Sequence, residues 1–228
     1  MEAYSSFAEV YDIFQDNVPY EEWCSYVTGL LREQGVERGL VLDLGCGYGW
    51  HCKFAVEQGA RQVLGIDLSQ KMIEEARRRN SGEGILYQVC GIEEYEYPKA
   101  AWDCVVSNLA LHYLEDLDSI FEKVHQTLKK DGIFLFNIEH PVFTAGVGQD
   151  WAYGEDGSPM YWPIDQYFMP GERITHFLGC EVRKQHHTLT QILMGLLRNG
   201  FILEAVEEAK PSEEMLDIPG MRDELRRP

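Results

Sequence analysis

The chain lacks any apolar run long enough to span a membrane, and its N-terminus shows no signal-peptide pattern. It is also poor in positive charge, since 20 Lys and Arg stand against 38 Asp and Glu for a formal net charge of -18. A phosphate backbone needs clustered Lys and Arg, and an anionic membrane surface attracts them. The charge balance therefore disfavours nucleic-acid and membrane partners and leaves a small-molecule partner open.

Closely spaced cysteine pairs are absent as well. The six cysteines are scattered at positions 24, 46, 52, 90, 104 and 180, and no two have Cys-x-x-Cys spacing. We interpret them as reduced thiols of a cytoplasmic protein, mostly small core residues. No set of His, Asp and Glu has helix-spaced ligand geometry, so no metal site is expected. Without repeats or low-complexity linkers, the sequence predicts one domain over residues 1–228.

The most informative feature present is an apolar run followed by alternating glycines. Residues 41–44, Val-Leu-Asp-Leu, precede Gly45, Gly47 and Gly49, and Trp50 begins a helix-like segment. This pattern predicts a buried strand, a tight turn and a helix start, where a bulky ligand can lie against bare backbone. A dinucleotide fingerprint would place its third glycine at position 50, so Trp50 disfavours an NAD-linked oxidoreductase.

A second acidic residue strengthens the prediction of a nucleoside site. Asp67 ends the predicted strand 62–66 and lies 24 positions after Asp43. An acidic residue at the tip of the second strand of a βαβ unit accepts hydrogen bonds from the two ribose hydroxyls. The alternative is that Asp67 only caps the following helix.

Four segments resemble class I S-adenosylmethionine-dependent methyltransferases. They are residues 41–49, Gly-Ile-Asp-Leu-Ser at 65–69, Asp-Cys-Val-Val-Ser-Asn at 103–108, and Leu-Lys-Lys-Asp-Gly at 128–132. Together they span about half of the chain in the family's order. The resemblance implies S-adenosylmethionine as cofactor and an α/β, Rossmann-like fold with a mostly parallel sheet flanked by helices.

Hydrophobic periodicity and capping residues predict alternating helices and strands, as such a fold requires. Helices are expected at 19–34, 50–58, 69–79, 117–130 and 188–200, and strands at 40–44, 62–66, 85–90, 104–107, 133–138 and 201–206. The family's sheet has a seventh, antiparallel strand, but no β-like run follows Val206. We expect that strand to be missing, through truncation or a natural end. The gap would close by pairing of strands five and six, or another chain would fill it, which makes a homodimer possible.

The resemblance implies the contacts of the methionine and ribose portions residue by residue. Asp43 would anchor the amino group of the ligand, directly or through water, or else only orient the glycine loop. The backbone of Gly45, Cys46 and Gly47 would line the methionine portion. Asp67 would accept hydrogen bonds from the ribose hydroxyls.

The adenine contacts depart from the family's pattern at one position. Leu68 and Met72 would cover one face of the ring, although Met72 is alternatively a core residue. In the family an acidic residue after strand three often binds the adenine amino group, and here that position is Gly91. Either Glu93 substitutes for it, or the backbone of Ile92 recognises adenine.

The loop after strand four would lie beside the sulfonium, where Asn108 and Leu109 offer backbone carbonyls. Asn108 is followed by Leu-Ala, as in the small-molecule members, and not by a Pro-Pro-Tyr-like sequence. The N-terminal residues 1–36 would form a helical cover over the cofactor. In that cover Tyr11 would touch the ligand's carboxylate end, or its segment would only pack on the domain.

Histidines supply the candidate catalytic bases, because imidazole can take a proton near neutral pH. His140 follows strand five at the carboxyl edge, where ligands sit in such sheets, and is the first choice. His112 is the second, although packing or capping is the favoured role in its motif. For His186 and His187 a structural hydrogen bond is the favoured role.

The long connection at residues 139–187 exceeds normal loop lengths and predicts a lid or pocket wall. Its aromatic residues, which suit an organic substrate or a small core of the insertion itself, are Trp151, Tyr153, Tyr161, Trp162, Tyr167 and Phe168. A short hairpin is expected between the run 177–182 and residues near Arg173.

We therefore expect in-line transfer of a methyl group from S-adenosylmethionine to an oxygen, nitrogen or carbon atom of a small-molecule acceptor. Alignment and water exclusion would be the main tasks of the protein. The alternatives are a non-catalytic protein that binds S-adenosylmethionine and, with less support, an NAD-linked oxidoreductase.

Overall fold

The computed structural model describes residue 29 and residues 38–146, 148–177, 180–208, 210–211 and 213–227. The described residues fall into two compact units. Unit 1 lies within Met1–Leu111, Asp118–Ile138 and Leu178–Cys180, and unit 2 within His112–Leu117, Glu139–Phe177 and Glu181–Pro228. That the chain acts as one domain stays a prediction. Tyr11 and, apart from helical Gly29, the cover 1–36 and the expected helix 19–34 lie outside the described residues.

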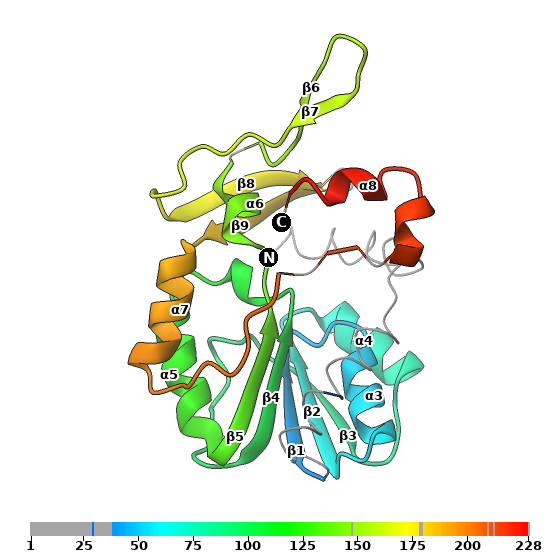
Figure 1. The fold of residues 1–228 in the computed structure, drawn as a ribbon. Coiled ribbons are helices and arrows are strands. Elements are labelled where there is room, and N and C mark those ends of the chain that lie inside the picture. Colours follow the sequence, from blue (N-terminus) through cyan, green and yellow to red (C-terminus); the bar gives the residue numbers. More distant parts are fainter. Residues whose placement is uncertain are drawn as a thin grey trace. The chain divides into compact units, whose positions relative to one another are not determined.

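Unit 1 is built on a five-stranded parallel sheet (Figure 1). Its strands are β1 (Leu40–Leu44), β2 (Gln62–Asp67), β3 (Ile85–Val89), β4 (Trp102–Asn108) and β5 (Leu128–Asn137), in the order β3-β2-β1-β4-β5. The order reverses between β1 and β4. The crevice beyond the carboxyl ends of strands at such a switch point is where ligands bind in open α/β sheets. The sheet confirms the predicted Rossmann-like, mostly parallel architecture.

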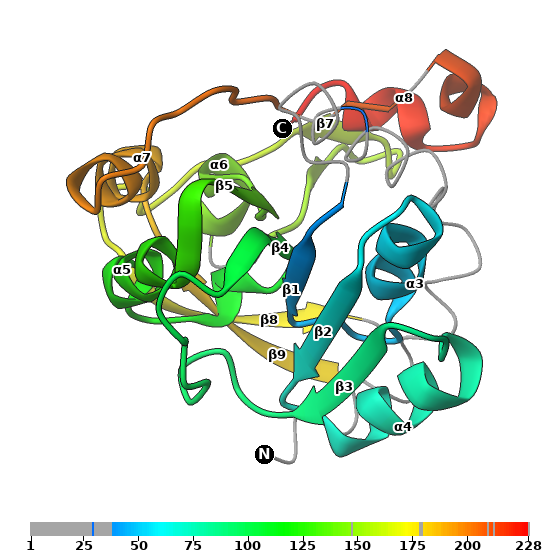
Figure 2. The same ribbon diagram turned by 90° about the horizontal axis from the view of Figure 1, so that it is seen from below.

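Helices cover both faces of this sheet. Figure 2 shows α3 (Trp50–Glu57) and α4 (Gln70–Arg79) on one face and α5 (Leu117–Thr127) on the opposite face. Buried side chains from strands and helices form the core on the α3 and α4 side, among them Val41, Cys52, Val63, Ile73, Cys104 and Val106. On the other side Phe121 of α5 packs against Phe134 and Phe136 of β5, with ring centroids 6.3 and 6.1 Å away. Burial of β1 and β4 from both sides explains their continuous apolar runs.

Most expected boundaries agree with the structure. Ser69 caps α4, since its Oγ accepts a hydrogen bond from Met72 N at 3.3 Å. The helix before β5 was expected to reach residue 130 but ends at Thr127. Leu128 instead pairs with Trp102, so β5 begins five residues earlier than expected, with an irregularity in the register before Cys104. Residues 128–130 therefore belong to a strand, although sequence periodicity favoured another helical turn there.

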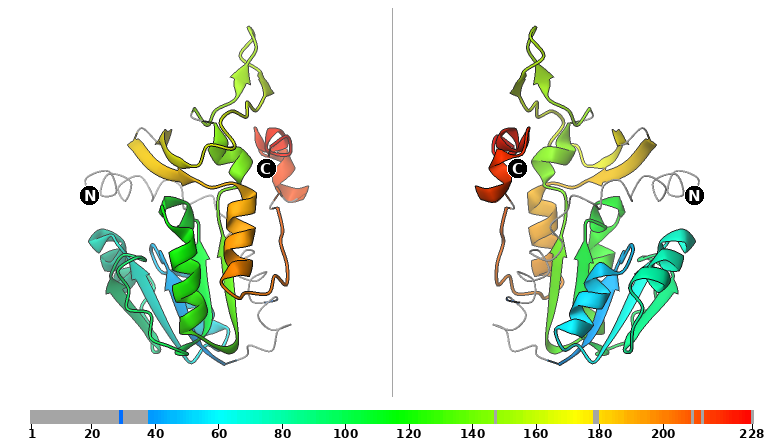
Figure 3. Two further views of the ribbon diagram at one scale, coloured as in Figure 1. Left: turned by 90° about the vertical axis from the view of Figure 1, so that its left-hand side faces the viewer. Right: turned by 90° about the vertical axis from the view of Figure 1, so that its right-hand side faces the viewer.

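Unit 2 contains short elements and two hairpins. Its elements are α6 (Pro141–Ala145), β6 (Ala152–Tyr153), β7 (Pro159–Tyr161), β8 (Gly171–Phe177), β9 (Cys180–His186), α7 (Leu189–Arg198), η2 (Glu213–Asp217) and α8 (Met221–Glu224). The short helix η1 (Leu111–Tyr113) lies where the chain first passes from unit 1 to unit 2. Strands β8 and β9 form the hairpin expected near Arg173. Both views of Figure 3 show β6 and β7 extending away from β8, β9 and α6.

The predicted sixth strand, Phe201–Val206, is wrong. These residues join none of the three sheets, and Ile202 and Val206 are 81% and 61% exposed. β propensity describes how well a side chain fits a half-buried pleated surface, and this segment has no such surface to pack on. The expected pairing of strands five and six is therefore not formed, and β5 is the edge strand of the sheet. In the described part of the chain no strand follows β9, in agreement with a missing seventh strand. The homodimer stays a prediction.

A helix that crosses a bilayer needs about 20 consecutive, mostly apolar residues. Among residues 29, 38–146 and the later described ranges, no helix is long and apolar enough to cross a membrane.

Candidate cofactor site

The glycine loop between β1 and α3 has a backbone that only glycine adopts easily. Gly45, Gly47 and Gly49 have φ values of 75°, 52° and 78°. The N–H groups of Gly45 and Cys46 both donate to the carbonyl oxygen of Ile66, each at 2.9 Å, which pins the loop to β2. No side chain caps the N-terminus of α3, whose N-cap residue is Gly49.

Close packing excludes side chains at two of these glycines. A Cβ atom at Gly45 would lie 2.5 Å from Cβ of Ala110, and one at Gly49 would lie 2.1 Å from the hydroxyl oxygen of Tyr87. The side chain of Cys46 is buried and faces Gly65, where an added Cβ would lie 2.9 Å from its sulfur. The loop therefore offers backbone to a ligand, as expected for the methionine portion.

Asp43 is almost fully buried at the end of β1, and one of its oxygens has no hydrogen-bond partner. Its side chain is 1% exposed; Oδ2 accepts from Cys52 Sγ at 3.2 Å, and no described group donates to Oδ1. Burial raises the pKa of Asp43 above the usual 3.8, while nearby His51 and the Cys52 hydrogen bond lower it. An unpaired buried carboxylate oxygen is costly, and a ligand ammonium or a water would satisfy it. The orphaned oxygen fits the amino group of S-adenosylmethionine.

Asp67 ties the glycine loop to the end of β2. Its Oδ2 accepts from Gly47 N at 3.0 Å and its Oδ1 accepts from Ser69 N at 2.8 Å. Burial raises the pKa of Asp67 above the usual 3.8, against the lowering effect of these two hydrogen bonds. Each carboxylate oxygen has a second lone pair, so both remain able to accept from a ribose hydroxyl. Ser69, and not Asp67, is the cap of α4.

The residues expected around adenine differ in exposure. Leu68 is 51% exposed, whereas Met72 is 3% exposed, which fits the alternative of a core role for Met72. An added Cβ at Gly91 would lie 3.6 Å from Cδ1 of Leu68, so these two positions adjoin. Ile92 approaches the glycine loop, with Cδ1 3.8 Å from an added Cβ at Gly45. Glu93 is exposed and its carbonyl accepts from Lys123 Nζ at 2.9 Å, so its carboxylate is not held in the site by these contacts.

The loop after β4 departs from relaxed backbone geometry. Leu109 has a φ of 51°, which is rare for a bulky residue, and its N–H donates to the carbonyl of Asn137 at 2.9 Å. Asn108 Oδ1 accepts from Asn137 Nδ2 at 3.2 Å. Strain of this kind persists where neighbouring structure fixes it and clusters at functional sites. Asn137 therefore supports the two residues expected beside the sulfonium.

Four supporting residues escaped the sequence analysis: Ala110, Asn137, Asn80 and Tyr87. Asn80 follows the last residue of the expected helix 69–79; it is 1% exposed and its Nδ2 donates to the carbonyl of Tyr48 at 2.7 Å. Tyr87 Oη in turn donates to the carbonyl of Asn80 at 2.8 Å. These contacts join positions 32 and 7 residues apart. No local sequence pattern signals such contacts.

His112, the second candidate base, lies buried in unit 2 beside a charged pair. Its Nε2 is 3.9 Å from Glu139 Oε1, which is itself 2.5 Å from Lys184 Nζ. Burial lowers the pKa of His112 to about 4, with Glu139 raising it and Lys184 lowering it. Neither His112 Nδ1 nor Glu139 Oε2 has a hydrogen-bond partner among the described residues. In the neutral tautomer that carries its proton on Nε2, toward the Glu139 carboxylate, the buried Nδ1 has a lone pair with no hydrogen-bond partner among the described residues.

The other three candidate histidines, His140, His186 and His187, have structural partners within unit 2. His140 caps α6, where Nδ1 accepts from Val142 N at 3.1 Å and Nε2 lies 3.0 Å from Glu208 Oε1. His186 bridges Thr144 Oγ1 and the carbonyl of Tyr167, at 2.8 and 2.9 Å. His187 Nε2 contacts the carbonyl of Leu114 at 2.9 Å. The neutral ring of His140 thus has its lone pair engaged by the cap, which weakens its case as a base, while the structural roles favoured for His186 and His187 fit these contacts.

The insertion's aromatic residues divide between core and surface. Phe143 stacks on Trp162 with centroids 5.0 Å apart, and Trp151 meets Trp162 edge-on at 5.6 Å. Tyr153, Tyr161 and Phe168 are 53%, 59% and 87% exposed.

Within the described ranges, no group of three or more His, Cys, Asp and Glu side chains could hold a metal ion.

Comparison with known proteins identifies the family. A family model described as "Methyltransferase domain" matches residues 42–136. The chain is 45% identical to a "putative S-adenosylmethionine dependent methyltransferase" from Listeria monocytogenes, with a TM-score of 0.82 over 88% of this chain and 91% of that one. It is 40% identical to an S-adenosylmethionine dependent methyltransferase from Mesorhizobium loti, with a TM-score of 0.78 over 88% and 92%. An "Uncharacterized protein" of Haemophilus influenzae is 30% identical over 175 residues, 74% of this chain and 69% of that protein.

The chain therefore belongs to the S-adenosylmethionine-dependent methyltransferases. It is an enzyme of this class, with S-adenosylmethionine as cofactor, and not an NAD-linked oxidoreductase. None of the three relatives carries a name that specifies a methyl acceptor.

Proposed function

We propose that unit 1 binds S-adenosylmethionine at the carboxyl ends of β1 and β2 and that the enzyme methylates a small organic molecule. The observation that carries the cofactor assignment is the buried Asp43 carboxylate, whose Oδ1 has no partner among the described residues. It lies at the start of a glycine loop whose backbone is bare and fixed. Asp67 follows at the tip of the neighbouring strand.

The residues of unit 1 divide the work of holding the cofactor. Asp43 takes the ammonium of the methionine portion, and Asp67 takes the ribose hydroxyls with the lone pairs that Gly47 and Ser69 leave free. Leu68, which is half exposed, covers one face of adenine. Adenine recognition passes to the backbone of Ile92, because the carboxylate of Glu93 faces solvent.

When bound, the sulfonium supplies an activated methyl group and a neutral leaving group. The chain's own contribution is to orient the cofactor through rigid backbone and to exclude water from the acceptor. Where the acceptor must lose a proton, we assign that step to Nδ1 of His112 before His140, whose Nδ1 is engaged by the α6 cap.

The direct test is calorimetric titration of the purified protein with S-adenosylmethionine, S-adenosylhomocysteine and NAD. We expect micromolar binding of both sulfur compounds and no binding of NAD. If neither sulfur compound binds to the folded protein, the assignment of S-adenosylmethionine as cofactor is overturned. Release of S-adenosylhomocysteine in the presence of candidate acceptors then reports turnover.

A further inference from the structure

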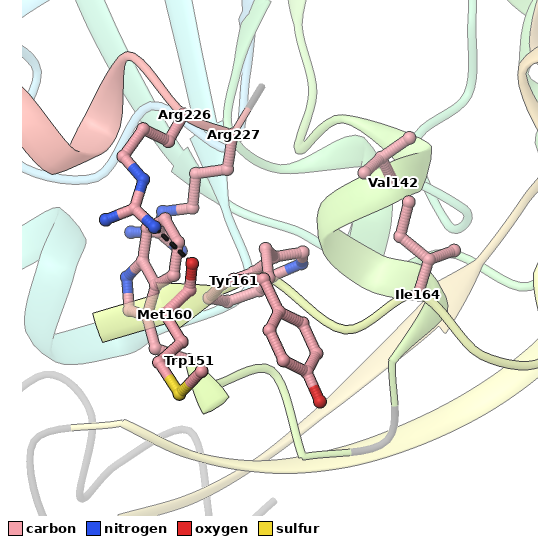
Figure 4. Close-up of a pocket in the computed structure, with 8 residues that line it drawn as sticks. Val142, Trp151, Met160, Tyr161, Ile164, Arg226 and Arg227 are labelled. Carbon is pink, nitrogen blue, oxygen red and sulfur yellow. Dashed lines mark hydrogen bonds between the residues drawn. The ribbon is translucent and has the colours of Figure 1, made fainter. Parts of the chain in front are cut away.

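Unit 2 contains a pocket that the cofactor site does not use. It has a volume of about 370 Å³, within the range of small-molecule sites, and lies between the β6–β7 hairpin, α6 and the arginines that follow α8. In the view of Figure 4, Trp151, Arg226 and Arg227 lie on one side, Val142 and Ile164 on the other, with Tyr161 between them. Every lining residue belongs to unit 2.

The walls of this pocket are flat or apolar and remain uncovered. Met160, Tyr161 and Ile164 are 57%, 59% and 56% exposed, although each is a large apolar side chain. Adjoining exposed apolar groups of this kind mark binding sites. Trp162 is held in place by stacking on Phe143 and by the edge of Trp151. The aromatic wall is therefore ordered without a ligand, which favours flat ligands.

The nitrogen atoms of the lining side chains are all hydrogen-bond donors. Guanidinium and indole N–H groups donate and cannot accept, and the lining includes two arginines and two tryptophans but no carboxylate. The indole Nε1 of Trp162 is buried and has no hydrogen-bond partner among the described residues. In a chain with 38 acidic and 20 basic residues, this lining contains two cations and no carboxylate, although Asp223 and Glu224 pair with the arginines from outside the lining. A complementary ligand must supply acceptor oxygens, and an anion supplies them best.

Contacts within unit 2 hold both arginines in place, but they do not use all of the hydrogen-bond donors of Arg227. Arg227 lies over Trp162, Phe143 and Trp151, with Cζ 4.4, 4.9 and 5.6 Å from the ring centroids. Its Nε and Nη2 donate to Glu224, which leaves the Nη1 donors for a ligand. Arg226 donates to the carbonyls of Pro159 and Met160 and so holds the C-terminal segment against β7. The ion pairs of both arginines with Asp223 and Glu224 are partly exposed and therefore weak competitors.

We infer that this pocket binds a flat, mostly apolar organic molecule that carries a carboxylate. The rings of Trp151, Tyr161 and Trp162 contact the flat body, and Arg227 with Trp162 Nε1 meets the carboxylate. Binding itself does not depend on the proposed function.

The test is calorimetry of the whole chain with three probes that share one flat body: trans-cinnamate, cinnamamide and cinnamylamine. We expect cinnamate to bind, cinnamamide to bind at least tenfold more weakly, and cinnamylamine not to bind. Hexanoate, an acid without a flat body, should also bind at least tenfold more weakly than cinnamate. Equal affinities for the acid and the amide, or no binding of cinnamate, would overturn the inference. Binding of S-adenosylhomocysteine to the same sample shows separately whether the cofactor site is intact.

Two pairs of variants locate the binding. Arg227→Gln should lose cinnamate affinity at least tenfold, whereas Arg222→Gln, on α8 with a 73% exposed side chain outside the lining, should keep it. Tyr161→Ser should weaken binding several-fold, whereas Tyr153→Ser, a similarly exposed tyrosine of the same hairpin outside the lining, should not. Wild-type affinity in both Arg227→Gln and Tyr161→Ser would contradict the assignment. The Tyr161 pair keeps the test valid if loss of Arg227 disturbs the fold.

Discussion

The proposed ligand sites of unit 1 and unit 2 are built from different parts of the chain: mainly backbone in unit 1 and side chains in unit 2. In unit 1 the glycine loop presents backbone, and its carboxylates Asp43 and Asp67 stand at the ends of adjacent parallel strands. In unit 2 the pocket is made of side chains drawn from positions 142 to 227, held by ring stacking and cation–π contacts. Backbone recognition needs particular residues at fixed spacing along one βαβ unit, whereas side-chain recognition does not. This difference explains why the sequence predicts the cofactor site of unit 1 but not the pocket of unit 2.

Two glycines with nearly the same positive φ offer the largest contrast between the units. Gly49 in unit 1 and Gly157 in unit 2 have φ values of 78° and 77°, but only Gly49 is packed, against Tyr87. Gly49→Ala should cost about 2–5 kcal/mol of unfolding free energy, from backbone strain plus the clash, and abolish cofactor binding. Gly157→Ala should cost about 1 kcal/mol from backbone strain alone. Urea unfolding measures both, and equal costs would contradict the packing argument.

Protonation of the buried His112 in unit 2 should lower the unfolding free energy of the protein at mildly acid pH. The pKa of His112 is lowered to about 4 in the folded state, from 6.5, so folding favours the neutral ring. Its contribution is present above pH 6.5 and is lost as the pH falls toward 4, with a total of up to about 3 kcal/mol. His112→Gln should flatten the profile of unfolding free energy between pH 7 and 4. An unchanged slope in the variant would mean that other groups cause the acid sensitivity.

The ribose assignment of Asp67 predicts a smaller effect, confined to unit 1. Asp67→Ala removes charge-assisted hydrogen bonds and should weaken S-adenosylhomocysteine binding by about 10- to 100-fold, as measured by calorimetry. Affinity equal to that of the wild type would remove Asp67 from the site.

The smallest expected effect is at Glu93, where two expectations compete. Because Glu93 is exposed, Glu93→Ala should change S-adenosylhomocysteine affinity by less than about twofold. A loss near that of Asp67→Ala would show instead that Glu93 replaces the acidic residue missing at Gly91.

The sequence predicted the parts of the fold whose signals are local. Strands β1 to β4 and helices α3 and α4 were expected within one or two residues, since apolar runs, glycines and the Ser69 cap mark their ends. The strand expected at Phe201–Val206 failed because strand formation depends on a partner surface that propensity does not encode. Asn80, Tyr87 and Asn137 went unnoticed for the same reason, since their roles arise only from contacts made in the folded chain.

The proposed cofactor site depends most on Asp43, whose buried carboxylate favours ligand binding and destabilises the ligand-free protein. Because its folded-state pKa is raised, the ionised carboxylate contributes no stability at pH 7; the stabilising contribution exists below pH 3.8 and is lost as the pH rises through the raised pKa. Asp43→Asn should therefore keep or raise the melting temperature of the ligand-free protein. Its affinity for S-adenosylhomocysteine should nevertheless fall at least tenfold, because the ammonium loses its counter-charge.

The decisive measurement is this pair of values at pH 7, melting temperature by calorimetric scan and affinity by titration, for wild type and Asp43→Asn. Retained stability with lost affinity is the predicted result. Lost stability with unchanged affinity would show that Asp43 only orients the glycine loop, and would contradict the account.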